Sequence, residues 1–159
     1  MAISASPNAG FSFGVWAGSG SGSYDGSNNP AMVTMNGPIT QTASFVANVS
    51  VTVSTSPAGR SFSVDGTGYS SSQAFSWIPG ASHTIATTSP QAGGAGTRYL
   101  FSSWSDGGAM SHNVAPTTSA TYTASFITQH QLTMSAGTGG SASPATGWQN
   151  AGASVPISA

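Results

Sequence analysis

The tetrapeptide Thr-Ala-Ser-Phe occurs twice in this chain, and each copy closes a segment with the same pattern of aromatic residues. The first copy ends at Phe45 and the second at Phe126. Upstream of them lie "GFSFGVWAGSGSGS", from Gly10, and "RYLFSSWSDGGAMS", from Arg98. Three aromatic residues recur 88 positions apart: Phe11 with Tyr99, Phe13 with Phe101, and Trp16 with Trp104. Such repetition indicates a tandem-repeat protein, and it constrains the fold more than any other feature.

Other phrases repeat as well and place the limits of each copy. The segment "AISASP" at 2–7 matches "TIATTSP" at 84–90, and "VPISA" at 155–159 begins the phrase a third time. The segment "VSVTVSTSPAG" at 49–59 returns as "HQLTMSAGTGG" at 130–140. These matches make three further pairs of residues equivalent: Val51 with Leu132, Val53 with Met134, and Trp77 with Trp148.

The matches divide the chain into three parts. Residues 1–45 are predicted to be the back half of one repeat, residues 46–126 a complete repeat, and residues 127–159 the front half of another, so that the chain is cut out of phase with the repeat. Each half-repeat would expose unpaired strand edges and half of a hydrophobic face. We therefore expect the back half-repeat (1–45) and the front half-repeat (127–159) to complement each other, within one chain or between chains.

Alternating residues predict strands throughout. The segments "VSVTVS" at 49–54 and "TYTASF" at 121–126 place apolar residues at every second position, which is typical of half-buried strands. No window of twelve residues has helical periodicity, and clusters such as "DGSNNP" at 25–30 supply turns. The predicted fold class is all-β, with two small antiparallel β-sandwich or open-barrel modules of about six strands each.

The chain is almost free of charge. Only five residues carry a formal charge, there is no lysine or glutamate, and the net charge is −1. Without a basic surface, binding to nucleic acid has no electrostatic support. No apolar run approaches the roughly 20 residues that a membrane helix needs, so no membrane insertion is expected. A surface without charge repulsion favours self-association or packing against neighbouring repeats.

The repeated motifs resemble a known family. They are a short alternating strand ending in Ser-Pro, an aromatic-rich "FxxW(S/A)(D/G)G" segment and a closing "T(Y/Q)TASF". Together they resemble the divergent internalin-B-type B-repeat, a module of large bacterial surface and secreted proteins, and the resemblance covers essentially the whole chain. It implies an extracellular or cell-surface location and a structural or adhesive role. Internalin B-repeats carry a helix on a grasp-like sheet, and this sequence has no pattern for that helix.

The four tryptophans admit two interpretations. Exposed rings at Trp16 and Trp104, together with Tyr99, could stack on sugars, which would make the chain a carbohydrate-binding accessory module. Because the tryptophans recur at matching positions in each copy, as the core residues of repeats do, packing in the interior is the favoured interpretation. Solvent exposure of Trp16 and Trp104 distinguishes the two.

Catalytic and metal-binding chemistry have little support. The aspartates are few, and each begins an Asp-Gly pair typical of a turn. His83, His112 and His130 lie on different predicted elements, so no metal site is expected. The G-x-S-x-G elbow of serine hydrolases is absent, although His83 or His112 beside an activated serine would permit hydrolysis. We therefore expect a structural or adhesive repeat module without catalytic residues or cofactors.

Overall fold

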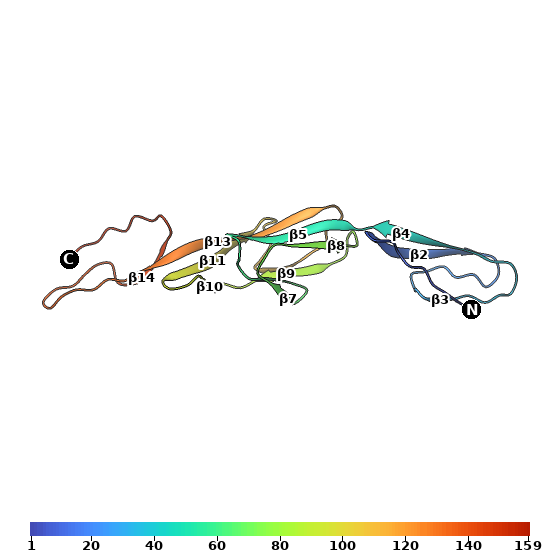
Figure 1. Ribbon diagram of the computed structural model, residues 1–159, viewed down its shortest axis with the longest axis horizontal. Helices are drawn as coiled ribbons and strands as arrows, with labels where there is room; N and C mark the ends of the chain where they lie inside the picture. The colour runs from blue at the N-terminus through green and yellow to red at the C-terminus, as the bar shows by residue number, and fades with distance from the viewer. The chain divides into compact units, whose positions relative to one another are not determined.

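The computed structural model describes all residues from 1 to 159 and consists of strands, turns and loops, with no helix (Figure 1). The all-β fold class predicted from the alternating patterns is confirmed. The structure contains no helix that could cross a membrane. The chain forms two compact units: Met1–Val51, Ala74–Ser82 and Ala115–Ala120 in the first, and Thr52–Gln73, His83–Val114 and Thr121–Ala159 in the second. The predicted boundaries of the half-repeats stay a prediction.

Two strand pairs build most of the first unit. Strands β2 (Phe11–Ser19) and β4 (Thr40–Ala47) form an antiparallel pair, with a register shift between Phe13 and Trp16. Strands β1 (Ala2–Ile3) and β3 (Ala31–Met32) form a second, shorter antiparallel pair. Trp16, Ala31 and Val33 are buried between these pairs and the adjoining loops. The back half-repeat thus has a small core of its own.

A four-stranded sheet lies in the second unit. Its strand order is β12 (Ser111–Val114), β9 (His83–Thr87), β6 (Phe62–Val64) and β7 (Thr67–Tyr69). Strands β6 and β7 are joined by Asp65 and Gly66, whose φ angles are 49° and 80°. A two-residue hairpin loop with both residues in the left-handed region is the turn that Asp-Gly favours. The predicted Asp-Gly turn is present at this position.

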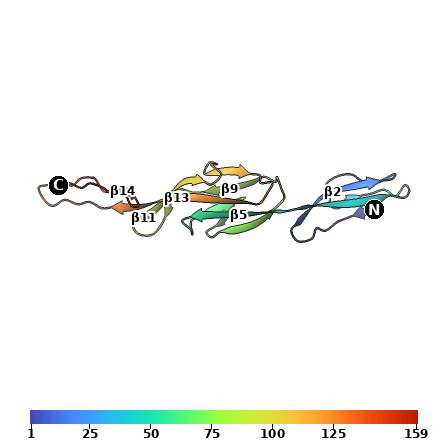
Figure 2. The ribbon, with the colours of Figure 1, turned by 90° about the horizontal axis from the view of Figure 1, so that it is seen from above.

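The largest sheet has the strand order β10 (Gln91–Ala92), β11 (Thr97–Trp104), β13 (Ala120–Leu132), β5 (Val49–Ser56) and β8 (Gln73–Trp77). Strand β14 (Gly147–Asn150) also pairs with β13, antiparallel. Strands β5 and β13 are neighbours that run in the same direction, as Figure 2 shows. The first and last strands of the complete repeat are therefore parallel partners in an otherwise antiparallel arrangement.

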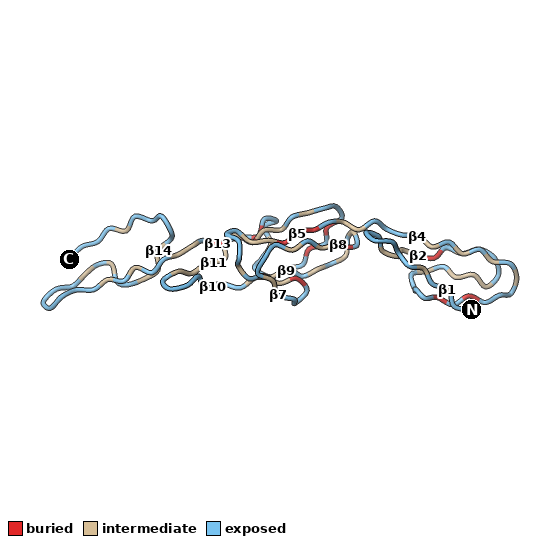
Figure 3. The backbone as a smooth tube through the Cα atoms, in the orientation of Figure 1, coloured by how far each residue is buried: buried red, intermediate tan, exposed pale blue.

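Burial follows the alternation of the strands and stops at Phe126. Val51 and Val53, the inward-facing residues of "VSVTVS", have no exposed surface, and neither does Ile85. No residue after Phe126 belongs to the buried core, and Figure 3 shows only intermediate and exposed backbone around β14. The front half-repeat is thus a folded segment that lacks a core.

Candidate functional site

The candidate site of this chain is its repeated aromatic cluster, which occurs once in each unit. In the second unit, Phe101 lies 6.4 Å from Trp104 at an interplanar angle of 56° and meets Phe126 edge to face at 6.1 Å. In the first unit, the equivalent Phe13 lies 5.7 Å from Trp16 at 52° and meets Phe45 edge to face at 6.3 Å. Edge-to-face pairs at such distances are favourable contacts. The same three-ring cluster is therefore built twice.

The strand register that holds these clusters is also repeated. Phe101 pairs with Phe126 and Trp104 with Ala124 in the antiparallel ladder of β11 and β13. The ladder of β2 and β4 pairs Phe13 with Phe45 and Trp16 with Ala43. Each ladder has its irregularity directly after the phenylalanine. A bulge at this point re-aims the next side chains, which turns the tryptophan ring toward the phenylalanine in both copies.

The short strand pairs repeat in the same way. His112 of β12 pairs with Ile85 of β9, and at the equivalent positions of the first unit Ala31 pairs with Ile3. A buried valine follows each pairing strand: Val114 and Val33 each lie twelve residues before the closing phenylalanine. This valine was missed in the sequence analysis, although its constant spacing from Phe45 and Phe126 is a signal that could have found it.

Both tryptophans proposed for sugar stacking are buried. Trp16 is 7% exposed and Trp104 2% exposed, and the Trp104 indole donates a hydrogen bond to the carbonyl of Met110 at 3.2 Å. Neither ring offers a free face to a sugar, so the exposure that stacking requires is not met at these two residues. Their burial agrees with the packing interpretation. Trp77 is buried too, while Trp148 of the front half-repeat is only half-buried.

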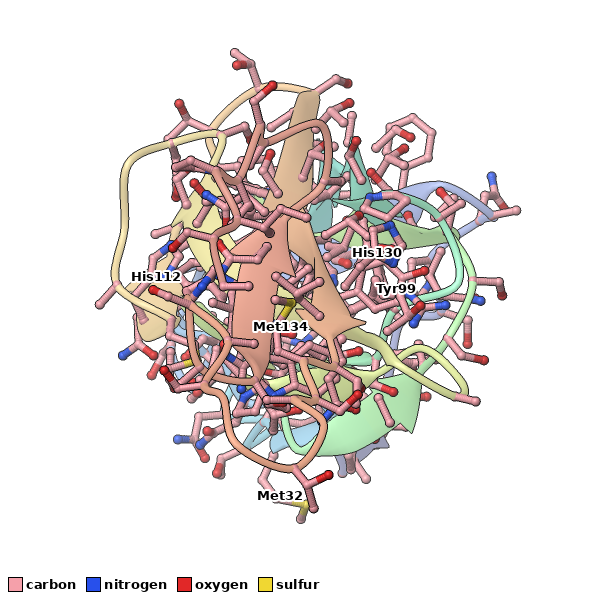
Figure 4. All side chains as sticks on the ribbon, turned by 90° about the vertical axis from the view of Figure 1, so that its left-hand side faces the viewer. Met32, Tyr99, His112, His130 and Met134 are labelled. Atoms are coloured by element: carbon pink, nitrogen blue, oxygen red, sulfur yellow. The ribbon has the colours of Figure 1, made fainter.

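Tyr99 is half-buried, and a cation covers its ring. The Arg60 guanidinium carbon lies 4.0 Å from the Tyr99 ring centre, and Arg60 also donates a hydrogen bond to the carbonyl of Ala92 at 3.2 Å. Tyr99 and His130 lie on neighbouring strands, β11 and β13, where Figure 4 labels both. The stacking hypothesis stays a prediction for Tyr99 alone, on the part of its surface that Arg60 leaves free.

An amide side chain marks the end of each back half. Asn48, which separates β4 from β5, accepts a hydrogen bond from Ser12 at 2.8 Å and donates one to Ser76 at 3.2 Å. The equivalent Gln129, within β13, accepts one from Arg98 at 2.8 Å and donates one to Asn150 at 2.8 Å. Each amide therefore ties a strand of the ending repeat to a strand of the next one. Sequence reasoning missed both, because Asn and Gln differ in length and stand outside the quoted motifs.

Comparison with known proteins identifies the module in the first part of the chain. Residues 1–49 match the divergent InlB B-repeat domain. The resemblance expected from the repeated motifs is confirmed over this segment, which holds β1–β4 and the first of the two aromatic clusters. No curated protein and no solved structure matches the chain.

The B-repeat motifs recur after residue 49 with the same ladder register and ring geometry. The side chains that distinguish the copies are the histidines and aspartates of the second unit. Asp65 accepts hydrogen bonds from the Thr84 amide at 2.8 Å and pairs with His83 Nδ1 at 2.7 Å. The His83 hydrogen bond and then the Thr84 amide lower the pKa of Asp65. This pair fixes the hairpin loop between β6 and β7 against β9.

A second aspartate–histidine pair lies beside Trp104. His112 Nε2 lies 2.8 Å from Asp106 Oδ2, and its Nδ1 lies 2.7 Å from the Ala109 carbonyl. Both oxygens only accept hydrogen bonds, so the ring satisfies both contacts when each nitrogen carries a proton. Burial raises the pKa of Asp106, but the hydrogen bonds from His112 and the Gly108 amide outweigh it and the pKa is lowered. The pair closes the Asp-Gly-Gly turn over the indole, which His112 meets edge to face at 6.0 Å.

The geometry around these histidines does not assemble a hydrolytic site. Both nitrogens of His112 face acceptors other than a serine hydroxyl, so this ring is not placed to activate a nucleophile. His130 bonds to the Thr97 hydroxyl on the neighbouring strand. No three histidine or carboxylate side chains meet in a group that could hold a metal ion. The arrangement supports turns and strands, and it offers no catalytic constellation.

Proposed function

We propose that this chain is a non-catalytic structural segment of a large bacterial extracellular or cell-surface tandem-repeat protein, acting as a spacer or adhesive array. The observation that supports this most strongly is the duplicated B-repeat cluster, in which the rings of Phe13, Trp16 and Phe45 repeat the geometry of Phe101, Trp104 and Phe126. Residues shared by the copies pack into the interior. They therefore serve the module itself, and a separate ligand is not needed to explain them.

Energetics favour an array over isolated modules. A β module of about 80 residues buries a limited core and is marginal alone, whereas stacked modules share interfaces. The hydrogen-bonded amides at Asn48 and Gln129 provide such a link between the end of one repeat and the start of the next. The near absence of charge removes the repulsion that would keep neighbouring modules or chains apart.

A direct test is a fused chain in which one repeat is completed covalently. Joining Ala159 to Ser6 of a second copy restores the phrase "VPISASP" and supplies the front half-repeat with a back half. If the proposal holds, Trp148 becomes as buried as Trp77, which is seen as loss of acrylamide quenching of its fluorescence in variants that retain only this tryptophan. The matched control joins the copies with the second one starting at Val46, so that a front half follows a front half. Equal quenching in the two fusions would contradict the tandem-repeat architecture.

A second candidate is glycan binding, favoured by one observation. The Arg98 guanidinium carbon lies 4.5 Å from the Trp148 ring centre, beside an open pocket of about 440 Å³ that Gln91 and Thr97 also line. An aromatic ring and hydrogen-bonding groups at one pocket are the usual elements of a sugar site. Titration of the chain with neutral and acidic oligosaccharides, followed by Trp148 fluorescence, checks this candidate, with Arg98→Ala as the variant that should lose any response.

A further inference from the structure

The front half-repeat has an open strand edge directly after β13. Met134 has its amide and carbonyl groups bonded to the Thr146 hydroxyl. In an extended chain the groups of neighbouring residues point to opposite sides. The backbone groups of Thr133 and Ser135 accordingly face the other side, where they have no hydrogen-bond partner. This edge is a template for another strand.

In the complete repeat the equivalent edge is occupied. Thr52 and Ser54, the equivalents of Thr133 and Ser135, lie in β5, and β13 is the neighbour of β5 in the sheet. Ser54 Oγ lies 3.1 Å from Thr123 Oγ1 of β13. The structure therefore shows which strand covers this edge: the one that ends in Thr-Ala-Ser-Phe.

The back half-repeat carries a second copy of that covering strand, and its edge is free. Strand β4 contains Thr42, the equivalent of Thr123, and pairs with β2 alone in a two-stranded sheet. Phe45, which has the same ring contacts as Phe126, is 41% exposed, whereas Phe126 is 9% exposed. Thr42 is exposed where Thr123 is half-buried. The covering strand and the edge that it fits are thus both present and both open.

The apolar surface of the front half-repeat matches this interpretation. Ile157, the equivalent of the fully buried Ile85, is 68% exposed, and Leu132, Met134 and Trp148 are only half-buried. Figure 4 draws Met134 among the side chains of this segment. Leu132 and Ile157 line an open pocket of about 340 Å³. Residues 127–159 contain no charged side chain, so the edge lacks the charges with which proteins usually protect exposed strands.

Strand direction favours a second copy as the source of the covering strand. Strands β5 and β13 are parallel neighbours. Strand β4 precedes β5 with only Asn48 between them, whereas Thr133 and Ser135 follow the part of β13 that pairs with β5. In a parallel pair, preceding and following segments leave from opposite ends. A single chain brings them together only by folding back, while a second copy needs no reversal.

We propose that the chain assembles head to tail, with β4 of one copy adding in parallel to the open edge at Thr133–Ser135 of the next copy. This inference rests on the proposed function, since it takes the two ends as halves of one repeat. Thr42 of one copy then lies beside Ser135 of the other, as Thr123 lies beside Ser54. Each added copy presents its own front half-repeat, so the contact is heterologous and continues into a filament or closes into a ring.

Disulfide trapping in the full chain tests this pairing. The chain has no cysteine, so each introduced thiol is unique. Thr42→Cys chains are mixed with Ser135→Cys chains under mild oxidation and compared with a mixture of Ser72→Cys and Ser135→Cys chains, because Ser72 is exposed but is not an equivalent position. The expected yield of cross-linked heterodimer is at least about tenfold above that control, since a docked pair holds the thiols at high effective concentration.

A positive control comes from the complete repeat. Ser54→Cys combined with Thr123→Cys in one chain should form an internal disulfide. If this control forms while the Thr42→Cys and Ser135→Cys mixture gives no more heterodimer than Ser72→Cys does, the docking proposal is overturned. A double variant, Thr42→Cys with Ser135→Cys, that cross-links only within single chains overturns the second copy as the occupant. Circular dichroism verifies that each variant is folded. The fused chain tests the repeat architecture separately, because its halves are joined covalently.

Discussion

The rings of Phe101 and Phe126 meet edge to face with their centres 6.1 Å apart, across paired positions of β11 and β13. Phe13 and Phe45 repeat this contact at 6.3 Å across β2 and β4. The two pairs differ in what covers them, because Phe126 is almost fully buried and Phe45 retains a large exposed surface. The duplicated geometry thus provides matched pairs of variants within one chain.

The first prediction concerns the closing phenylalanines. Phe126→Ala removes a buried ring and should cost about 3–5 kcal/mol, whereas Phe45→Ala should cost roughly half as much, because part of that ring is already in water. Amide hydrogen exchange measures the two losses separately, in β13 for Phe126 and in β4 for Phe45. Equal losses would show that Phe45 is covered in solution to the same extent as Phe126.

The second prediction concerns the two buried indoles. Trp104 Nε1 donates to the Met110 carbonyl, but Trp16 Nε1 is buried with no hydrogen-bond partner. Replacement by phenylalanine removes similar volume at both sites, but only Trp104→Phe also removes a hydrogen bond. Trp104→Phe should therefore be more destabilising than Trp16→Phe by about 1 kcal/mol. Denaturant melts of both variants, each followed by exchange in its own strand pair, provide the comparison. A larger loss for Trp16→Phe would contradict it.

The third prediction is a dependence of stability on acid. The pKa values of Asp65 and Asp106 are lowered below their ordinary value of 3.8, in Asp65 mainly by His83 and in Asp106 by His112 and Gly108 against the opposing effect of burial. A carboxyl whose pKa is lower in the folded chain stabilises the fold above its unfolded pKa, and this contribution is lost as the pH falls through the folded pKa. The free energy of unfolding should therefore decrease as the pH falls below 3.8.

Asparagine substitutions isolate this acid dependence. Asp65→Asn and Asp106→Asn keep the shape of each side chain and its amide contacts but remove the ionisation. The double variant should be less stable than the parent chain at neutral pH, and the difference should shrink as the pH falls. Thermal melts across an acidic pH series measure both curves. Parallel curves would mean that the two carboxylates do not contribute through their charge.

Local patterns made much of the fold predictable. Alternation in "VSVTVS" and "TYTASF" indicated strands with Val51, Val53, Ala124 and Phe126 inward, and all four are buried. Repetition indicated that the tryptophans pack inside, as Trp16 and Trp104 do. The parallel pairing of β5 with β13 was not predicted, because the choice of partner between strands 70 residues apart depends on tertiary packing. The aspartate–histidine pairs were missed for a related reason: only the folded turns bring Asp65 beside His83 and Asp106 beside His112.

The last prediction tests the contact between Arg60 and Tyr99, whose guanidinium carbon and ring centre are 4.0 Å apart. A cation over an aromatic face at a partly exposed site contributes about 0.5–1 kcal/mol, and the planar guanidinium stacks better than an ammonium. A double-mutant cycle with Arg60→Ala and Tyr99→Leu should therefore return a coupling of about 0.5–1 kcal/mol. Arg60→Lys keeps the charge and should recover only part of it. Tyr99→Phe keeps the ring and is the matched control, with little expected change. A coupling near zero would mean that the hydrogen bond from Arg60 to the Ala92 carbonyl, and not the ring, holds this side chain in place.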